Sequence, residues 1–169
     1  MSNGALNVAR TGLDAQNMRM QVKHRLKIAY EDLKALNPRL IYASISGFGQ
    51  TGPYRARAGY DFLIQGMAGI MDLTGDPHGE PQKIGVAFAD IFTGLYGVIA
   101  IQAALAQRER TGRGQHIDMA LLDCMTGVLA NQALNYLVSG VSPHRMGNAH
   151  PNIAPYQVFE AADGPLVVA

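Results

Sequence analysis

The amino-acid sequence predicts an α/β fold in which long apolar helices alternate with short strands. Two long stretches, 90–110 and 120–138, are apolar enough to form helices of a protein core. Two shorter stretches, 39–45 and 114–119, are rich in residues that suit a pleated, buried surface. Strands that alternate with long helices are typical of layered α/β proteins.

The first half of the chain predicts two helices on either side of one strand. Residues 1–25 are polar and only weakly periodic. Ile28, Leu33 and Leu36 then have the spacing of an amphipathic helix, which Asn37-Pro38 would end. The elements expected after this helix are a strand over 39–45, a glycine-rich loop over 46–54, a helix over 61–73 and a turn over 75–79.

The second half predicts two long helices and three further strands. Because most residues of 91–106 are apolar, we expect the helix over 90–110 to be buried in the core, with Gly112 as its C-terminal cap. In the strand over 114–119, His116 and Asp118 share one face. The remaining expected elements are a helix over 120–138, a polar loop over 142–156 and strands over 157–159 and 166–169. A strand at the end of the sequence needs a neighbour, which indicates a fragment or a chain that depends on a partner.

The composition excludes several classes of function. A formal net charge of +1 gives no electrostatic footprint for nucleic acid. The longest apolar run is shorter than a membrane span, and the first residues lack an apolar signal core, so we expect a soluble, cytoplasmic protein. The single cysteine, Cys124, excludes an internal disulfide, and the five histidines show no metal-ligand spacing, so we expect no metal site.

Asp61 and Asp90 are the candidate functional carboxylates, because each precedes an apolar helix. Such a residue is commonly a helix cap, whose side-chain oxygen accepts a backbone N–H. It can also be a covalent nucleophile, if it is positioned, ionised and shielded from water. The field of a following helix would keep Asp90 ionised. The local pattern leaves both roles open. The glycine-rich loop gives only weak evidence for phosphate binding, because no helix directly follows Gly52.

Five segments decide between these roles by a resemblance to a known family. They are LNPRLIYASISGFGQTGPY (36–54), RAGYDFLIQGMAGIMDLTG (57–75), GVAFADIFTGLYG (85–97), RTGRGQHIDMALLD (110–123) and GNAHPNIAPYQVFEAADG (147–164). In order and spacing they resemble the family III (CaiB/BaiF-type) CoA-transferases, which include formyl-CoA and carnitine CoA-transferases. The combination of Gly-Tyr-Asp, Phe-Ala-Asp and Gly-Arg-Gly-Gln resembles members that use dicarboxylic acids such as succinate.

The resemblance implies the fold and its extent. We expect residues 30–169 to be part of the large Rossmann-like domain of such an enzyme, truncated at both ends. Residues 1–29 are expected to be an atypical N-terminal segment. The resemblance also implies a homodimer in full-length members of the family.

The resemblance implies the chemistry as well. Asp90 matches the family's nucleophile, which would form an aspartyl anhydride and then an aspartyl-CoA thioester while CoA moves between carboxylic acids. Residues Ala58, Gly59, Tyr60 and Asp61 match the segment that lines the CoA site. Acyl-CoA and a small carboxylic acid are then the substrates, without a metal, and neither nucleic acid nor a membrane is a partner.

Two alternatives stay open at this point. The related α-methylacyl-CoA racemases carry histidine, a proton-transfer base, where this chain has Tyr60. A tyrosine with an ordinary pKa near 10 is a poor base at neutral pH, so Tyr60 favours transfer over racemisation. The other alternative is an inactive, truncated remnant.

Overall fold

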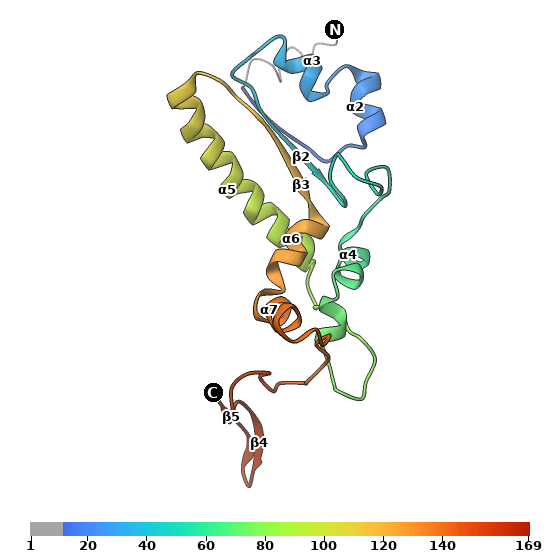
Figure 1. Cartoon of the computed structure of the whole chain (residues 1–169), viewed down its shortest axis with the longest axis vertical. Coiled ribbons are helices and arrows are strands. Elements are labelled where there is room, and N and C mark those ends of the chain that lie inside the picture. The colour runs from blue at the N-terminus through green and yellow to red at the C-terminus, as the bar shows by residue number, and fades with distance from the viewer. Residues whose placement is uncertain (1–11) are drawn as a thin grey trace.

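The structure, a computed structural model, describes residues 12–169. It contains a sheet of three parallel strands: β1 (Leu13–Gln16), β2 (Ile41–Ser46) and β3 (His116–Ala120), in the order β1-β2-β3. Figure 1 labels β2 and β3 in the half of the elongated molecule that lies away from the C-terminus. Leu13 lies opposite Ile41, and Tyr42 opposite His116. Helices make the connections that parallel strands require, so the predicted α/β class is confirmed.

The helices follow the strands in a simple order. Between β1 and β2 come α2 (Met20–Leu26) and α3 (Tyr30–Lys34). Between β2 and β3 come α4 (Asp61–Met67), the short 3₁₀ helix η1 (Ile70–Leu73) and α5 (Phe88–Thr111). After β3 come α6 (Leu121–Val128), α7 (Ala130–Ser139) and an antiparallel hairpin of β4 (Gln157–Ala161) and β5 (Gly164–Val168). Figure 1 shows α5 alongside β2 and β3, and the hairpin at the end of the elongated molecule far from β1.

β2 is the most deeply buried element, as expected of a central parallel strand. Ile41, Tyr42, Ala43 and Ser44 are each at most 1% exposed. Two apolar clusters form the core around the sheet. The first joins Leu33, Leu40 and Tyr42. The second, which we call the α4–α6 core, joins Ile64, Ala89, Leu121 and Met125. The α4–α6 core fixes the start of α5 against α4 and α6.

Several predicted boundaries are wrong for local backbone reasons. The helix predicted over 61–73 is interrupted at Gly69, whose φ of 86° lies in the left-handed region and ends α4. The helix predicted over 120–138 is two helices, because Ala130 has a φ of 49° at the junction. The helix predicted over 28–36 is the shorter α3. The polar segment before residue 25 contains β1 and the start of α2, which weak periodicity concealed.

The prediction that the long apolar helix is buried is wrong for the described part of the chain. Only Ala89, Thr93, Gly97 and Ala104, along one side of α5, are buried. Large apolar side chains on its other sides are exposed, because no described element covers them. By length and composition alone, α5 is the one helix within residues 12–169 that could span a membrane, a criterion that core helices also meet.

The last strand, β5, has a neighbouring strand, as the sequence led us to expect. β5 pairs with β4 in an antiparallel hairpin, with Val158 opposite Val167. The connecting turn lies at 162–163, between the two predicted strands.

Candidate active site

A cavity of about 450 Å³ lies where the three parallel strands end. Its walls include residues 17–21 after β1, residues 45–47 at the end of β2 and Leu121 directly after β3. The carboxyl ends of parallel strands meet at one edge of a sheet, and α/β proteins bind ligands in the crevice outside that edge. The cavity is therefore where this class of fold places a ligand.

All five residues that the sequence singles out line this one cavity. Ala58, Gly59, Tyr60 and Asp61 come from the loop after β2 and the start of α4, while Asp90 comes from the first turn of α5. The two groups are separated by a helix and a long loop in the sequence. The tertiary structure brings them together through the α4–α6 core.

Asp90 lies within the first turn of α5 and is not its N-cap residue. The helix begins at Phe88, and its N-cap is Ala87, whose side chain has no oxygen to accept an N–H. Residues three and four positions apart share a face of a helix. Thr93 and Gly94 accordingly line the cavity with Asp90. No atom lies within 4 Å of the position of a Gly94 Cβ, so this glycine leaves room beside the carboxylate.

Asp61 supplies the cap that α5 lacks. It is the first residue of α4, yet its Oδ1 accepts hydrogen bonds from Ala89 N at 2.8 Å and Asp90 N at 3.3 Å. The sequence predicted that Asp61 either caps a helix or takes part in chemistry. It caps a helix, but that helix is α5 and not the one it begins.

The electrostatic environment of Asp90 differs from the one expected. Desolvation by the surrounding protein raises the pKa of Asp90, and the negative charge of Asp61 raises it further. The field of α5, which was expected to keep Asp90 ionised, is therefore opposed by burial and by the charge of Asp61. The carboxylates of Asp61 and Asp90 both lie at the start of α5. Asp61 accepts the hydrogen bonds of the backbone amides of Ala89 and Asp90. No described residue donates a hydrogen bond to the Asp90 side chain.

Gly59 is required by packing between two backbones. A Cβ on Gly59 would lie 2.6 Å from Gly47 Cα, and a Cβ on Gly47 would lie 2.5 Å from Gly59 Cα. The contact presses the segment 58–61 against the glycine-rich loop after β2. Tyr60 is 75% exposed beside it, and Ala58 is also exposed. The cavity wall at this point is therefore mostly main chain and small side chains.

Three arginines that the sequence did not single out as a set also line the cavity: Arg19, Arg55 and Arg57. Within residues 12–169 none of them forms an ion pair. The guanidinium of Arg57 lies 4.0 Å from the centre of the Tyr54 ring, which holds it over an aromatic face. Unpaired guanidinium groups beside a cavity favour an anionic ligand.

A network of polar side chains connects α2, β2 and β3 to the glycine-rich loop over 46–54. Lys23, 3% exposed, donates from Nζ to Ser44 Oγ and to Gln50 Oε1, both at 2.9 Å. Gln50 lines the cavity, and its N–H donates to Asp118 Oδ2 at 2.8 Å. Ser44 Oγ lies 2.9 Å from His116 Nε2. Lys23 thus links α2 and β2 to the loop. Among residues 12–169, no cluster of three metal-ligating side chains occurs.

Sequence reasoning missed part of the cavity for identifiable reasons. Residues 17–21 follow a strand of only four residues, which the polar N-terminal segment hid. Gly94 could have been found, because it lies four positions after Asp90 and so shares its face of the helix. The contribution of Gln50 could not have been found from the sequence. It depends on a hydrogen bond that Lys23 donates to the Gln50 side chain from 27 positions away.

The fold and the cavity define this chain as an α/β protein with a carboxylate-lined cavity at the carboxyl edge of a parallel sheet. The family model described as "CoA-transferase family III" matches residues 14–169. The chain belongs to this family, as the resemblance predicted.

Several characterised relatives are similar to this chain. It is 64% identical over 140 residues to the succinate–glutarate CoA-transferase of Agrobacterium fabrum, an alignment that covers 83% of this chain and 35% of the relative. It is 44% identical over 155 residues to the acetyl-CoA:oxalate CoA-transferase of Acetobacter aceti, covering 91% and 40%. The chain therefore spans well under half the length of these relatives.

A solved structure has a similar fold. The crystal structure of a CaiB/BaiF family protein from Brucella suis matches with a TM-score of 0.90 and 66% sequence identity. This match covers 98% of the present chain and 44% of that protein.

Proposed function

We propose that this chain carries the reacting carboxylate of an acyl-CoA:carboxylate CoA-transferase, with Asp90 as the nucleophile. The observation that carries the proposal is the convergence of Asp90 and residues 58–61 on one cavity at the carboxyl edge of the sheet. The family membership supports the same class of reaction. Residues 58–61 form one wall of this cavity, and the pantetheine arm of CoA lies along Ala58, Gly59 and Tyr60.

The proposed reaction conserves the thioester through covalent intermediates on Asp90. The carboxylate attacks the thioester carbonyl carbon, the C–S bond breaks, and CoA leaves as a thiolate, so that an aspartyl anhydride remains. The thiolate then attacks the Asp90 carbonyl carbon, releasing the donor acid and forming an aspartyl-CoA thioester. An acceptor carboxylate repeats these steps in reverse. Water must be kept from the anhydride, because hydrolysis would waste it.

The substrates of this proposal are acyl-CoA and small carboxylic acids, including dicarboxylates such as succinate. The names of similar proteins support dicarboxylates, since they include succinate–glutarate and succinyl-CoA:mesaconate CoA-transferases. The arginines along the cavity supply positive charge for the phosphates of CoA or for a carboxylate. The homodimer and the cytoplasmic location stay predictions, which size-exclusion chromatography and cell fractionation check.

The proposal is tested by trapping the intermediate. The chain is incubated with succinyl-CoA and treated with hydroxylamine or borohydride, and the Asp90 peptide is analysed by mass spectrometry. We expect an adduct on Asp90 that is lost in Asp90→Asn and kept in Asp163→Asn, which removes a charge from the exposed hairpin turn. A folded protein that forms no adduct would contradict the proposal in favour of an inactive chain. Exchange of the α-proton of a branched acyl-CoA without acyl transfer would contradict it in favour of a racemase.

A further inference from the structure

The start of α5 is held by another helix. A helix N-terminus leaves backbone N–H groups without partners inside the helix, and an N-cap side chain usually accepts one of them. Ala87 cannot do so. Asp61 of α4 accepts two such groups, Ala89 N and Asp90 N, with the single oxygen Oδ1. The backbone of Asp90 is thus bonded directly to Asp61.

Gln65, one turn further along α4, holds the same junction from the buried side. It is 0% exposed. Its Nε2 donates to Asp61 Oδ2 at 2.7 Å and to Val86 O at 3.3 Å, while its Oε1 accepts from Ile84 N at 2.9 Å. The side chain therefore fixes the carboxylate of Asp61 and also the segment that leads into α5.

These contacts leave the Asp61 carboxylate fully engaged with protein. Oδ1 receives two backbone donors, and Oδ2 receives the Gln65 amide. Its charge also complements the positive end of the α5 dipole. By contrast, the Asp90 side chain receives no hydrogen bond from a described residue, and its pKa is raised first by desolvation and then by Asp61. A more basic carboxylate is a stronger nucleophile once it is ionised.

We propose that Asp61 and Gln65 form a clamp that positions Asp90, so that Asp61 is a positioning residue and not a ligand of CoA. This inference rests on the proposed function for its catalytic meaning. Its structural content does not, because the clamp joins α4 to α5 in the absence of any substrate. Gln65 acts through Asp61 and through the backbone at Ile84 and Val86.

The structural content is tested by NMR, which needs no activity. In Asp61→Ala, the Ala89 and Asp90 amide protons should exchange with solvent faster than in the parent chain, because they lose the oxygen that accepts their hydrogen bonds. In Asp61→Asn, the carboxyl signal of Asp90 should titrate at a lower pH than in the parent, because the neighbouring negative charge is gone. Asp163→Asn should leave both readouts unchanged. Unchanged exchange of these two amides in Asp61→Ala, or an unchanged titration of Asp90 in Asp61→Asn, would overturn the clamp.

The catalytic meaning is tested by separating binding from reaction. In Asp61→Asn and Gln65→Met we expect the rate of adduct formation at saturating succinyl-CoA to fall about tenfold or more, since small misplacements of a reacting group are costly. The KM for succinyl-CoA should change much less. A large rise in KM with an unchanged Asp90 titration would make Asp61 a ligand and overturn the inference. If the parent chain forms no adduct, the proposed function fails while the NMR result still decides the clamp.

Discussion

Asp90 lies in an environment that opposes the ionised form of its carboxyl group. Its pKa is raised in the fold, by desolvation first and by Asp61 second. A carboxyl whose folded pKa exceeds its unfolded value stabilises the fold fully only below the unfolded pKa, ordinarily near 3.8. The contribution is lost as the pH rises through the folded pKa. At neutral pH the ionised Asp90 therefore destabilises the fold.

Replacing this carboxylate should consequently stabilise the protein at neutral pH. We expect Asp90→Asn to have a higher Tm than the parent chain at pH 7, with the difference shrinking as the pH falls toward 4. Thermal unfolding followed by circular dichroism over this range checks the prediction. Asp163→Asn is the control, with an expected change within about 0.5 kcal/mol for an exposed site. A lower Tm for Asp90→Asn at pH 7 would contradict it.

His116 has the opposite dependence on pH. Desolvation lowers its pKa from 6.5, an effect that Lys23 reinforces and that Asp118 and Glu31 oppose. A group whose folded pKa is depressed stabilises the fold above its unfolded pKa, and this contribution is lost as the pH falls through the folded pKa. The parent chain should therefore lose stability below about pH 6.5 more steeply than His116→Gln, which keeps a polar partner for Ser44. Urea unfolding at pH 7.5 and pH 5 measures the two slopes, and equal slopes would refute the prediction.

At the scale of elements, the contact between two glycines joins the loop after β2 to the start of α4. Gly59→Ala would place a methyl group 2.6 Å from Gly47 Cα and 3.2 Å from Ile64 Cδ1. Because backbone cannot rotate away as a side chain can, we expect a loss of about 3 kcal/mol in the free energy of unfolding. Gly127→Ala in α6 is the matched control.

Gly59 and Gly127 differ in the space around the position that an alanine Cβ would occupy. No atom lies within 4 Å of the Gly127 Cβ position, so alanine there should stabilise α6 by about 0.5–1 kcal/mol. Urea titration of both variants gives the comparison. Similar effects of the two substitutions would show that the close contact has no energetic weight.

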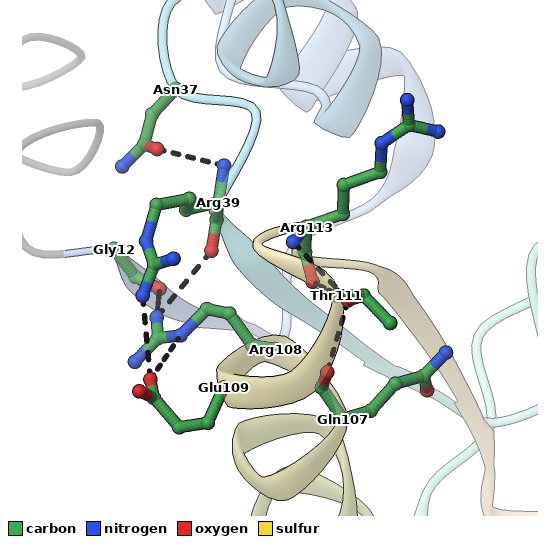
Figure 2. A network of polar contacts seen from close by, with 8 residues as sticks. All are labelled: Gly12, Asn37, Arg39, Gln107, Arg108, Glu109, Thr111 and Arg113. Atoms are coloured by element: carbon green, nitrogen blue, oxygen red, sulfur yellow. Dashed lines mark hydrogen bonds and ion pairs between the residues drawn. The ribbon is translucent and has the colours of Figure 1, made fainter.

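The far end of α5 is anchored by one arginine. Figure 2 shows Arg108 reaching the carbonyl of Gly12 before β1 and that of Arg39 before β2, at 3.1 and 3.4 Å from Nη1. Its Nε lies 3.9 Å from Glu109 Oε1, which also pairs with the Arg39 guanidinium at 3.3 Å. The side chain is 18% exposed. The anchor therefore ties α5 to the starts of two strands, at the end opposite Asp90.

Loss of this anchor should be measurable. Since hydrogen bonds from charged groups contribute about 1.5–3 kcal/mol, Arg108→Ala should lower the free energy of unfolding by about that amount. Arg110→Ala, at an exposed position of the same turn, should change it by less than about 0.5 kcal/mol. Chemical denaturation distinguishes the two variants, and equal losses would contradict a specific anchor.

At the scale of the whole molecule, the described chain presents much apolar surface. Along α5 the exposed fraction is 48% for Ile91, 55% for Leu95, 58% for Val98 and 63% for Ile99. Contiguous apolar surface of this kind on a protein in water promotes association. We expect the isolated chain to bind a hydrophobic dye and to associate as its concentration rises.

Charged side chains on the exposed apolar face of α5 should weaken dye binding and association. The double substitution Val98→Lys and Ile99→Glu should reduce dye fluorescence and association, measured by light scattering, with little change in helix content. Lys34→Glu and Glu31→Lys, an exposed pair on α3, serve as the control. A parent chain that stays monomeric and binds no dye would contradict the prediction.

The sequence by itself determined the class of fold and the family, and it singled out the candidate site residues. Alternating apolar stretches identified β2, β3, α5 and the final hairpin, because hydrophobic periodicity is a local property of the chain. The sequence also singled out Asp90 and residues 58–61 by their match to family motifs, without indicating that these residues line the same cavity. It did not reveal the breaks at Gly69 and Ala130, where single residues adopt left-handed backbone inside otherwise helical stretches.

Only the tertiary structure decided how those residues work together. The sequence shows two aspartates that each precede a helix, and both resemble caps of their own helices. The fold places Asp61 at the start of the other helix, where it takes the amide donors that would otherwise favour the Asp90 charge. The physical reason is that a hydrogen bond and a desolvated charge depend on distance in space. Residues separated by a whole helix and loop become neighbours only when the chain folds.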